Sequence, residues 1–188
     1  MEAGTSAFVV RRLGADEWQA YRAIRLQALA QDPDAFGSTL ALEQALAPAT
    51  WSARVAKAAV SGIDCPLVAE AAGALVGLAW AKVDGERPGN VNLYQMWVAP
   101  QWRGQGVAGA LLRAATAWAR ERGAQSLELG VNCANPAAIG LYAREGLLVV
   151  GAPYPMREGT ALMEQRMQLV LSTTWDAEAS HVDITTRP

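Results

Sequence analysis

The sequence predicts a single domain of the α/β class, in which one mixed sheet carries helices on both faces. The 188 residues are 52% hydrophobic, which is enough to build one folded core. Strand-like and amphipathic helical segments follow one another in the order β-α-α-β-β-β-α-β-α-β-β. A central run that is apolar on both alternating faces is typical of a strand covered on both sides.

The N-terminal half is predicted to form a strand, two helices and a hairpin. Asp16 is expected to cap the first helix, and the Asp32-Pro33 step is expected to end it. The stretch DPDAFGSTLALE between the two helices is expected to be a loop. The expected elements are a strand over 8–13, helices over 16–32 and 48–59, and hairpin strands PLVAEA and ALVGLAWAKV around an Ala-Gly turn.

The C-terminal half is predicted to alternate strands and helices, with residues 1–171 forming the domain and 172–188 a polar tail. In the run VNLYQMWV, Leu93 and Trp97 are expected on one face, and Tyr94, Met96 and Val98 on the other. The remaining expected elements are a helix ending at Gly123, the strand LELGVN with its leucines and Val131 inward, a helix from Pro136 to Glu145, and strands LLVVGA and LMEQRMQLVL.

Composition argues against several classes of function. The net charge of -2 does not fit a general nucleic-acid binder. No N-terminal segment has the features of a signal peptide and the longest apolar run, 71–81, is too short for a membrane span, so we expect a cytoplasmic protein. The only histidine is His181, in the polar tail, which leaves no His-based triad or metal site. Cys65 and Cys133 lie far apart and are expected to be reduced.

The stretch RGQGVAG contains a G-x-G-x-x-G pattern at Gly104, Gly106 and Gly109. A dinucleotide site is poorly supported, because VAPQWR separates these glycines from their strand and the acidic partner could only be the mid-strand Glu128. A Walker-type loop would need Lys-Ser/Thr after the glycines. The loop still presents backbone N–H groups at a helix start, where Arg103 adds positive charge, and it therefore predicts an anion site. A turn whose glycines only relieve strain is the alternative.

A second motif, NPAAIGLYAREG, begins at Asn135. Asn135 and Tyr142 are seven residues apart, almost two helical turns, so both side chains point from one face about 10 Å apart along the axis. Each residue also has an ordinary structural explanation. Asn135 before Pro136 is a favourable helix start, and a tyrosine on a short helix is frequently part of the core.

Together the two motifs resemble those of the GNAT superfamily of N-acetyltransferases. VAPQWRGQGVAGALL is similar to the family's acyl-CoA pyrophosphate motif at Arg103, Gly106 and Ala108, and NPAAIGLYAREGL is similar to its N-x-x-A-x-x-L-Y-x-x-x-G-F helix. The order of elements from Phe8 to Leu171 also follows that fold. The resemblance implies a mostly antiparallel sheet of about six to seven strands. It further implies acetyl-CoA as cosubstrate, no metal, and direct transfer of the acetyl group to an amine.

The resemblance also assigns site residues. Backbone amides of the glycine loop would hold the CoA pyrophosphate, the backbone of the preceding strand end would bind pantetheine and polarise the thioester carbonyl, and Asn135 would contact pantetheine or phosphate. Tyr142 would be the catalytic acid: its reference pKa of about 10 exceeds the thiol value of about 8.5, and on this basis we expect it to protonate the departing thiolate. The expected cofactor-binding residues are Trp97, Val98, Arg103, Gly104, Gln105, Gly106, Val107, Ala108 and Asn135.

The general base is not assigned by the resemblance. Many members of the family carry a glutamate on the central strand, where this sequence has Gln95, which cannot usefully accept a proton. Three alternatives are open. Ordered water could carry the proton away, a carboxylate such as Glu43 or Glu70 could accept it, or the amine could bind already neutral.

The acceptor is expected to be a primary amine of a small molecule, with no nucleic-acid or membrane partner. A protein N-terminus or lysine is the alternative acceptor, and a catalytically weak acetyl-CoA-binding sensor is the alternative of another class. A homodimer is an expectation from the family. The residues expected to line the acceptor cleft are Asp34, Phe36, Glu43 and Tyr154, from DPDAFGSTLALE and the PYPMREGT loop.

Overall fold

The computed structural model describes residues 7–171, so the predicted tail with His181 lies outside the described residues. The first eight elements are β1 (Val9–Arg12), α1 (Trp18–Gln31), the 3-10 helix η1 (Pro33–Ala35), α2 (Leu40–Gln44), α3 (Pro48–Ser61), β2 (Asp64–Ala71), β3 (Ala74–Val83) and β4 (Asn90–Val98). The next six are the 3-10 helix η2 (Pro100–Trp102), α4 (Val107–Glu121), β5 (Ser126–Asn132), α5 (Pro136–Arg144), β6 (Leu148–Pro155) and β7 (Met163–Val170).

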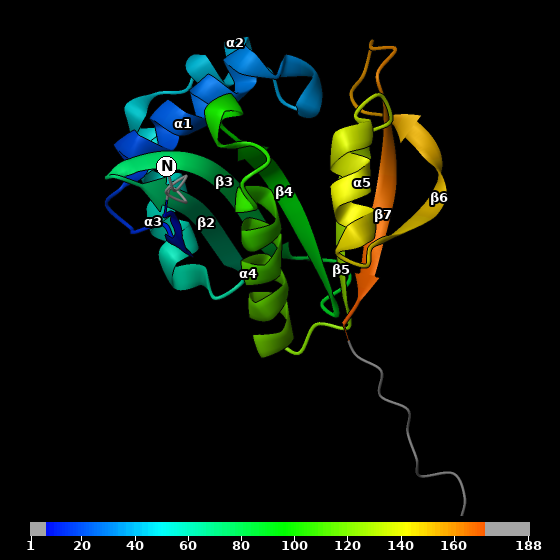
Figure 1. The fold of residues 1–188 in the computed structure, drawn as a ribbon. Helices are drawn as coiled ribbons and strands as arrows, with labels where there is room; N and C mark the ends of the chain where they lie inside the picture. The colour runs from blue at the N-terminus through cyan, green and yellow to red at the C-terminus, as the bar shows by residue number, and fades with distance from the viewer. Residues whose placement is uncertain (1–6, 172–188) are drawn as a thin grey trace, which may run out of the picture.

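The strands form one seven-stranded sheet in the order β1-β2-β3-β4-β5-β7-β6 (Figure 1). Within residues 7–171, β4 and β5 form the one parallel pair, and the other neighbouring strands are antiparallel. This confirms the predicted mixed, mostly antiparallel sheet.

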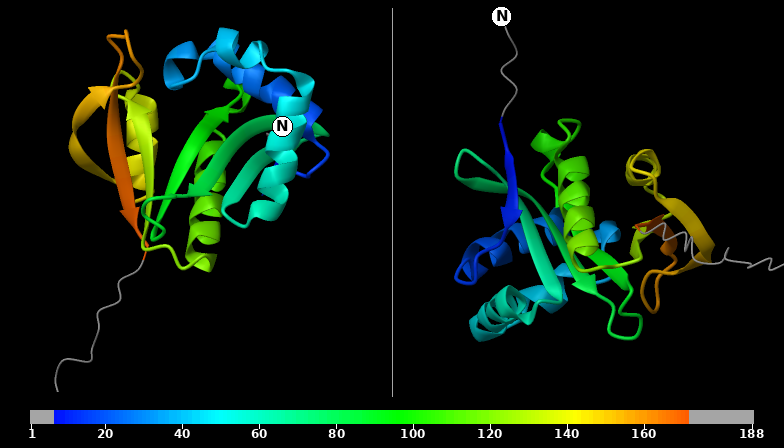
Figure 2. Two further views of the ribbon diagram at one scale, coloured as in Figure 1. Left: turned by 180° about the vertical axis from the view of Figure 1, so that it is seen from behind. Right: turned by 90° about the horizontal axis from the view of Figure 1, so that it is seen from below.

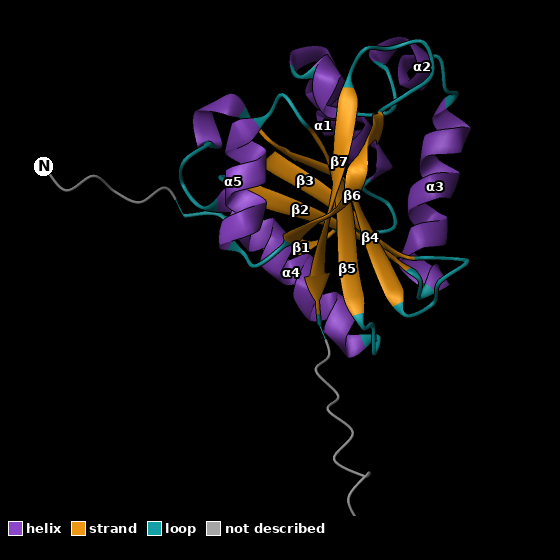
Figure 3. Ribbon diagram, turned by 90° about the vertical axis from the view of Figure 1, so that its right-hand side faces the viewer, coloured by secondary structure: helices purple, strands orange, loops and turns teal. Residues whose placement is uncertain are grey.

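Helices cover both faces of the sheet, as predicted (Figures 2 and 3). On one face, Val107, Leu111 and Trp118 of α4 are buried in a core with side chains of β2 to β5 and with Tyr142 of α5. On the other face, Ile24 of α1 packs in a second core together with side chains of α3. The apolar stripe of each helix faces the sheet, and this burial is what stabilises the two layers.

Two local predictions in the N-terminal half are wrong. Glu17, not Asp16, occupies the cap position of α1, and it makes no side-chain cap bond. Its carboxylate instead accepts hydrogen bonds from Arg11 and from the Gly14 amide, because a charge-assisted bond is stronger than a cap to a neutral amide. The stretch expected to be a loop contains η1 and α2, and Thr39 caps α2 by accepting a hydrogen bond from the Leu42 amide.

The expected faces of β4 are also wrong, because the strand contains a bulge. Gln95 has a left-handed φ of 57°, and the pairing of β4 with β3 shifts register opposite Leu78 and Trp80. The extra residue reverses the alternation of side chains beyond it. Leu93 therefore joins the core under α4, whereas Trp97 joins the core under α1.

The parallel pair β4–β5 is short, and this opens the sheet. Its register runs from Asn90 opposite Ser126 to Leu93 opposite Leu129, and then stops. Beyond that point β4 stays paired with β3, while β5 stays paired with β7. The two strands diverge, as Figure 1 shows, and both the bulge and the glycine loop lie on the β4 side of the opening.

Candidate active site

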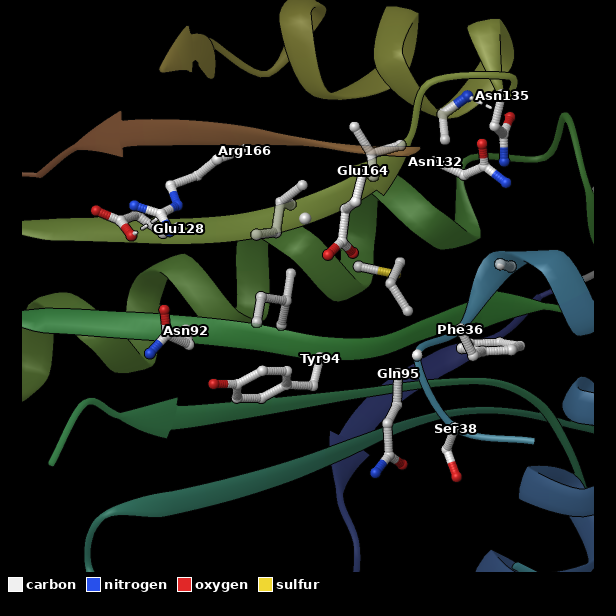
Figure 4. A pocket seen from close by; sticks show the side chains of 18 of the residues that line it. Phe36, Ser38, Asn92, Tyr94, Gln95, Glu128, Asn132, Asn135, Glu164 and Arg166 are labelled. Carbon is white, nitrogen blue, oxygen red and sulfur yellow. Dashed lines mark hydrogen bonds and ion pairs between the residues drawn. The ribbon is translucent and has the colours of Figure 1, made fainter. Parts of the chain in front are cut away.

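A cleft of about 590 Å³ lies where β4 and β5 separate (Figure 4). Its walls come from the bulged part of β4, from β5 and β7, from the start of α5, and from the segment between α1 and α2. Asn135 and Tyr142 both line it, as do Phe36, Glu43 and Tyr154 of the expected acceptor liners. The structure therefore brings Asn135 and Tyr142 together with three of the expected acceptor liners, whereas residues 97–98 and 103–108 are not among the residues that line this cleft.

The glycine loop lies at the N-terminus of α4. Gly104 and Gly106 have left-handed φ angles of 73° and 84°, and a Cβ built on either would meet nothing within 4 Å. Within the part of the chain that the structure describes, the amides of residues 104–109 have no hydrogen-bond acceptor. Unpaired amides at the positive end of a 15-residue helix, free of side-chain bulk, form a site that suits an anionic ligand.

The Arg103 side chain does not extend over this loop. Its Nε donates to the Val98 carbonyl at 3.0 Å, and its terminal nitrogen donates to the Asp32 carboxylate at 2.6 Å. The same Asp32 oxygen accepts a hydrogen bond from Trp97 Nε1 at 2.7 Å. Arg103 thus joins the loop to the end of β4 and to the end of α1, and its backbone N–H also has an acceptor, the Pro100 carbonyl at 3.2 Å.

The backbone at the end of β4 is partly available. The Ala99 amide bonds to the Val76 carbonyl, so Ala99 faces β3. Because hydrogen-bonding directions alternate along a strand, the neighbouring Val98 faces away from β3, toward the opening. Its carbonyl is already used by Arg103, which leaves the Val98 N–H for a ligand.

Asn135 and Tyr142 come from the same helix, as the spacing predicted. Asn135 Oδ1 accepts a hydrogen bond from the Ala138 amide at 3.1 Å, so this residue caps α5 and offers its Nδ2 to the cleft. Tyr142 is 6% exposed, and burial raises its pKa to about 12. Among the described residues its hydroxyl has no hydrogen-bond partner, which leaves the O–H for a ligand.

Neither predicted carboxylate is suited to be the base. Glu43 lines the cleft, but it is bound at 2.6 Å to the buried Arg25 and lies 3.7 Å from Arg54. Burial raises its pKa, but the hydrogen bond and charge of Arg25 outweigh burial and lower the pKa overall. Glu70 pairs with Arg11 on the β1–β2 side of the sheet and is not among the residues that line the cleft.

Gln95 also has a structural partner. Its Oε1 accepts a hydrogen bond from the Tyr21 hydroxyl at 2.9 Å, which fixes the side chain at the bulge. The residue lines both the cleft and an adjoining hollow of about 650 Å³ under α3. The hydrogen bond therefore ties the bulge of β4 to α1.

The acceptor side of the cleft is closed by contacts between distant segments. Asn132 Nδ2 donates to the Asp34 carbonyl at 2.8 Å, and Arg157 donates to the Phe36 carbonyl at 3.1 Å. These bonds hold the segment after α1 against β5 and the β6–β7 loop. The Asp34 side chain itself is 69% exposed and does not line the cleft, so the expectation for this residue is wrong.

The sequence reading did not identify the polar face of β5 and β7. Register places Glu128 opposite Gln168, Gly130 opposite Arg166, and Asn132 opposite Glu164. The alternation that predicts the inward leucines of β5 also implies a polar opposite face, and this alternation is the sequence signal that could have identified it. Glu128 is 4% exposed and pairs with Arg87 at 3.0 Å, so it is occupied within the fold and not presented to a dinucleotide.

The chain and its fold are similar to those of known acetyltransferases. A profile described as the Acetyltransferase (GNAT) family matches residues 26–147. Mycothiol acetyltransferase from Clavibacter sepedonicus is 31% identical over 144 residues, which cover 77% of this chain and 43% of that protein. Mycothiol acetyltransferase from Propionibacterium freudenreichii is 42% identical over 82 residues, covering 42% of this chain and 26% of that protein. The structure of yncA from Salmonella typhimurium with its cofactor acetyl-CoA has a TM-score of 0.73 and 22% identity, covering 92% of this chain and 99% of that one.

The chain spans less than half the length of these two curated relatives. The similarity to proteins named as acetyltransferases places the chain in the class of acyltransferases. The profile match, which covers more than half of the chain, identifies the family within that class. The chain belongs to the GNAT family of acetyltransferases.

Two further observations bear on the sequence predictions. Both cysteines are free, Cys65 buried and Cys133 exposed. Over residues 7–171, every helix is too short or too polar to cross a membrane. The expectations of a metal-independent reaction and of a homodimer stay predictions.

Proposed function

We propose that this chain is an N-acetyltransferase that moves an acetyl group from acetyl-CoA to a primary amine of a small molecule by direct attack. The observations that carry this proposal are the row of unpaired amides at the start of α4 and the cleft lined by the buried Tyr142 at the opening between β4 and β5. The names of the similar mycothiol acetyltransferases refer to a small molecule, which supports a small-molecule acceptor for this chain.

The residues present suit acetyl-CoA. The amides of residues 104–109 can hold its pyrophosphate, and the open space above Gly104 and Gly106 leaves room for phosphate oxygens. The Val98 N–H and Asn135 Nδ2 are free to bond the pantetheine arm. When bound, acetyl-CoA supplies an activated acetyl group at its thioester. A backbone donor at the thioester carbonyl would stabilise the charge that develops on that oxygen.

Tyr142 is proposed to assist departure of the sulfur. With a pKa of about 12 its hydroxyl stays protonated at neutral pH and can donate a hydrogen bond as negative charge builds on sulfur. The expectation from reference pKa values is therefore wrong in direction, because an acid with a pKa of about 12 is weaker than a thiol in water, whose pKa is about 8.5. Burial disfavours the charged form of both groups, so it also raises the pKa of a thiol leaving beside Tyr142 and makes proton transfer between them less unfavourable.

Filling the loop at Gly106 tests the cofactor site. Gly106→Trp is expected to raise the Kd for acetyl-CoA by about tenfold or more, because a bulky side chain there covers the amides. The matched control is Gly123→Trp, at the other end of α4, where φ is also left-handed at 70° and the space is also open. Both changes strain the backbone alike. Isothermal titration that finds equal acetyl-CoA affinities for the two variants would contradict the proposed site.

A further inference from the structure

We propose that Glu164 binds the ammonium group of the acceptor and takes its proton, so that the base of this enzyme lies on β7. The proposal deepens the proposed N-acetyltransferase function and rests on it. It rests on three features of Glu164: its position in the cleft, the space made for it on β5, and its lack of a cation partner among the described residues.

Glu164 is placed on the cleft by strand register. It lies opposite Asn132, whose side chain faces the segment after α1, and directly paired residues share one face of a sheet. Figure 4 shows its carboxylate pointing away from β7 toward β4, and Glu164 lines the same cleft as Tyr94 and Gln95. This is the part of the cleft beyond the point where β4 and β5 separate.

A glycine on β5 makes room for this carboxylate. A Cβ built on Gly130 would clash with the Glu164 carboxylate, so no other residue fits there without moving Glu164. Gly130 does not have a left-handed φ, so the backbone conformation does not require glycine at this position. The glycine therefore serves to seat the Glu164 side chain flat against the strand, at the floor of the cleft.

The charges of the cleft single out Glu164. Glu43 is neutralised by Arg25 at 2.6 Å, and Glu128 is neutralised by Arg87 at 3.0 Å, with Arg166 at 3.9 Å. Glu164 has no ion pair with any residue from 7 to 171. Arg166, two residues along the same face, points toward Glu128 instead (Figure 4). The carboxylate without a cation is thus the one best able to bind a cationic substrate.

The neighbouring tyrosine responds to this charge. Burial, followed by the adjacent Glu164 carboxylate, raises the pKa of Tyr154 to about 12. Tyr154 also lines the cleft, so its hydroxyl stays protonated beside Glu164. An ammonium group bound between them would meet the negative charge of Glu164 and one neutral hydroxyl, while the Arg166 guanidinium, 5.9 Å from the Tyr154 ring, is paired with Glu128 at 3.9 Å.

The reaction balances with Glu164 in this role. The ammonium group gives one proton to Glu164, which releases it to water, and the neutral nitrogen then forms a bond to the acetyl carbonyl carbon. The carbon–sulfur bond breaks and its electron pair leaves on sulfur. The Tyr142 hydroxyl gives its proton to that sulfur and recovers it from the second proton lost by nitrogen. The net products are the acetylated amine, the free thiol and one proton.

The test compares Glu164→Gln with wild type, using the best acceptor from a panel of alkylamines, polyamines, amino acids and amino sugars. At pH 7 the variant is expected to lose about 10²–10⁴-fold in kcat/KM for the amine while its Kd for acetyl-CoA stays within about twofold. Glu164→Asp should recover part of the loss. Glu121→Gln, an exposed glutamate at the C-terminal end of α4 that does not line the cleft, is the matched control and should behave as wild type.

A pH series separates a base from a merely structural residue. Primary amines have pKa values near 10.4, so a growing fraction is neutral as the pH rises, and the deficit of Glu164→Gln should shrink toward about tenfold or less by pH 10. A deficit that stays constant with pH, or a variant as active as wild type, overturns the role of Glu164 and leaves the proposed function standing. A wild-type protein that acetylates no amine in the panel overturns the proposed function and this inference with it.

Discussion

Replacing Tyr142 by phenylalanine is expected to lower kcat by about 10²–10⁴-fold, while the Kd for acetyl-CoA changes by no more than about twofold. Tyr142 is 6% exposed, and phenylalanine keeps the ring that packs in the core under α4 and α5. The variant removes only the hydroxyl, which is positioned to act on sulfur as charge develops. Steady-state kinetics and isothermal titration measure the two quantities separately.

The matched control for this variant is Tyr94→Phe. Tyr94 also lines the cleft, but it lies on β4 and is 50% exposed, so its hydroxyl is solvated. The same chemical change there should leave kcat close to that of wild type. Because the pKa of Tyr142 is about 12, wild-type kcat should also show no loss from its ionisation up to about pH 10. A Tyr142→Phe variant that turns over at the wild-type rate would contradict the role of Tyr142 as the acid that assists departure of the sulfur.

Replacing Glu43 by alanine is expected to lower the free energy of unfolding by about 3–5 kcal/mol. Arg25 is 3% exposed and depends on Glu43 for its charge partner at 2.6 Å. Its Nη1 already has no hydrogen-bond partner among the described residues, so loss of Glu43 leaves the buried guanidinium largely uncompensated. Denaturant unfolding followed by circular dichroism gives the difference from wild type.

The control is Glu70→Ala, which breaks an ion pair of 2.7 Å whose side chains are 35% and 33% exposed. Exposed pairs contribute about 1 kcal/mol or less, so this variant should be nearly as stable as wild type. The pKa of Glu43 is lowered in the folded protein, so its contribution is present above the unfolded value of about 4.3 and is lost as pH falls below it. If the two variants lose the same free energy of unfolding, the buried Arg25–Glu43 pair is not a main source of stability.

Much of the fold could be predicted because each element carries its own signal. Every predicted strand and long helix is found close to its expected limits, and the Asp32-Pro33 step ends α1 as expected. The glycine loop and the helix starting at Asn135 were recognisable because their chemistry depends on residues near each other in sequence. Backbone amides at a helix start and side chains seven residues apart are local features.

The features that sequence reasoning missed depend on pairing between strands. The bulge at Gln95 exists only relative to β3, and it moves Trp97 to the opposite face. The salt bridge from Arg103 to Asp32 joins residues 71 positions apart. The sequence therefore could not show that the Arg103 side chain pairs with a carboxylate of the protein and not with a phosphate of the ligand. Glu164 reaches the cleft only through its register with β5. None of these arrangements has a periodic signal in the sequence.

A thermal-shift titration with acetyl-CoA, CoA and NAD side by side tests the central claim most directly. At a hundred times its Kd a ligand should add about 2.7 kcal/mol, which corresponds to roughly 5–10 °C in melting temperature for a domain of this size. The account predicts such a shift with acetyl-CoA and CoA and none with NAD. A shift with NAD alone would mean that the glycine loop holds a dinucleotide, and it would contradict the assignment of the cleft to acetyl transfer.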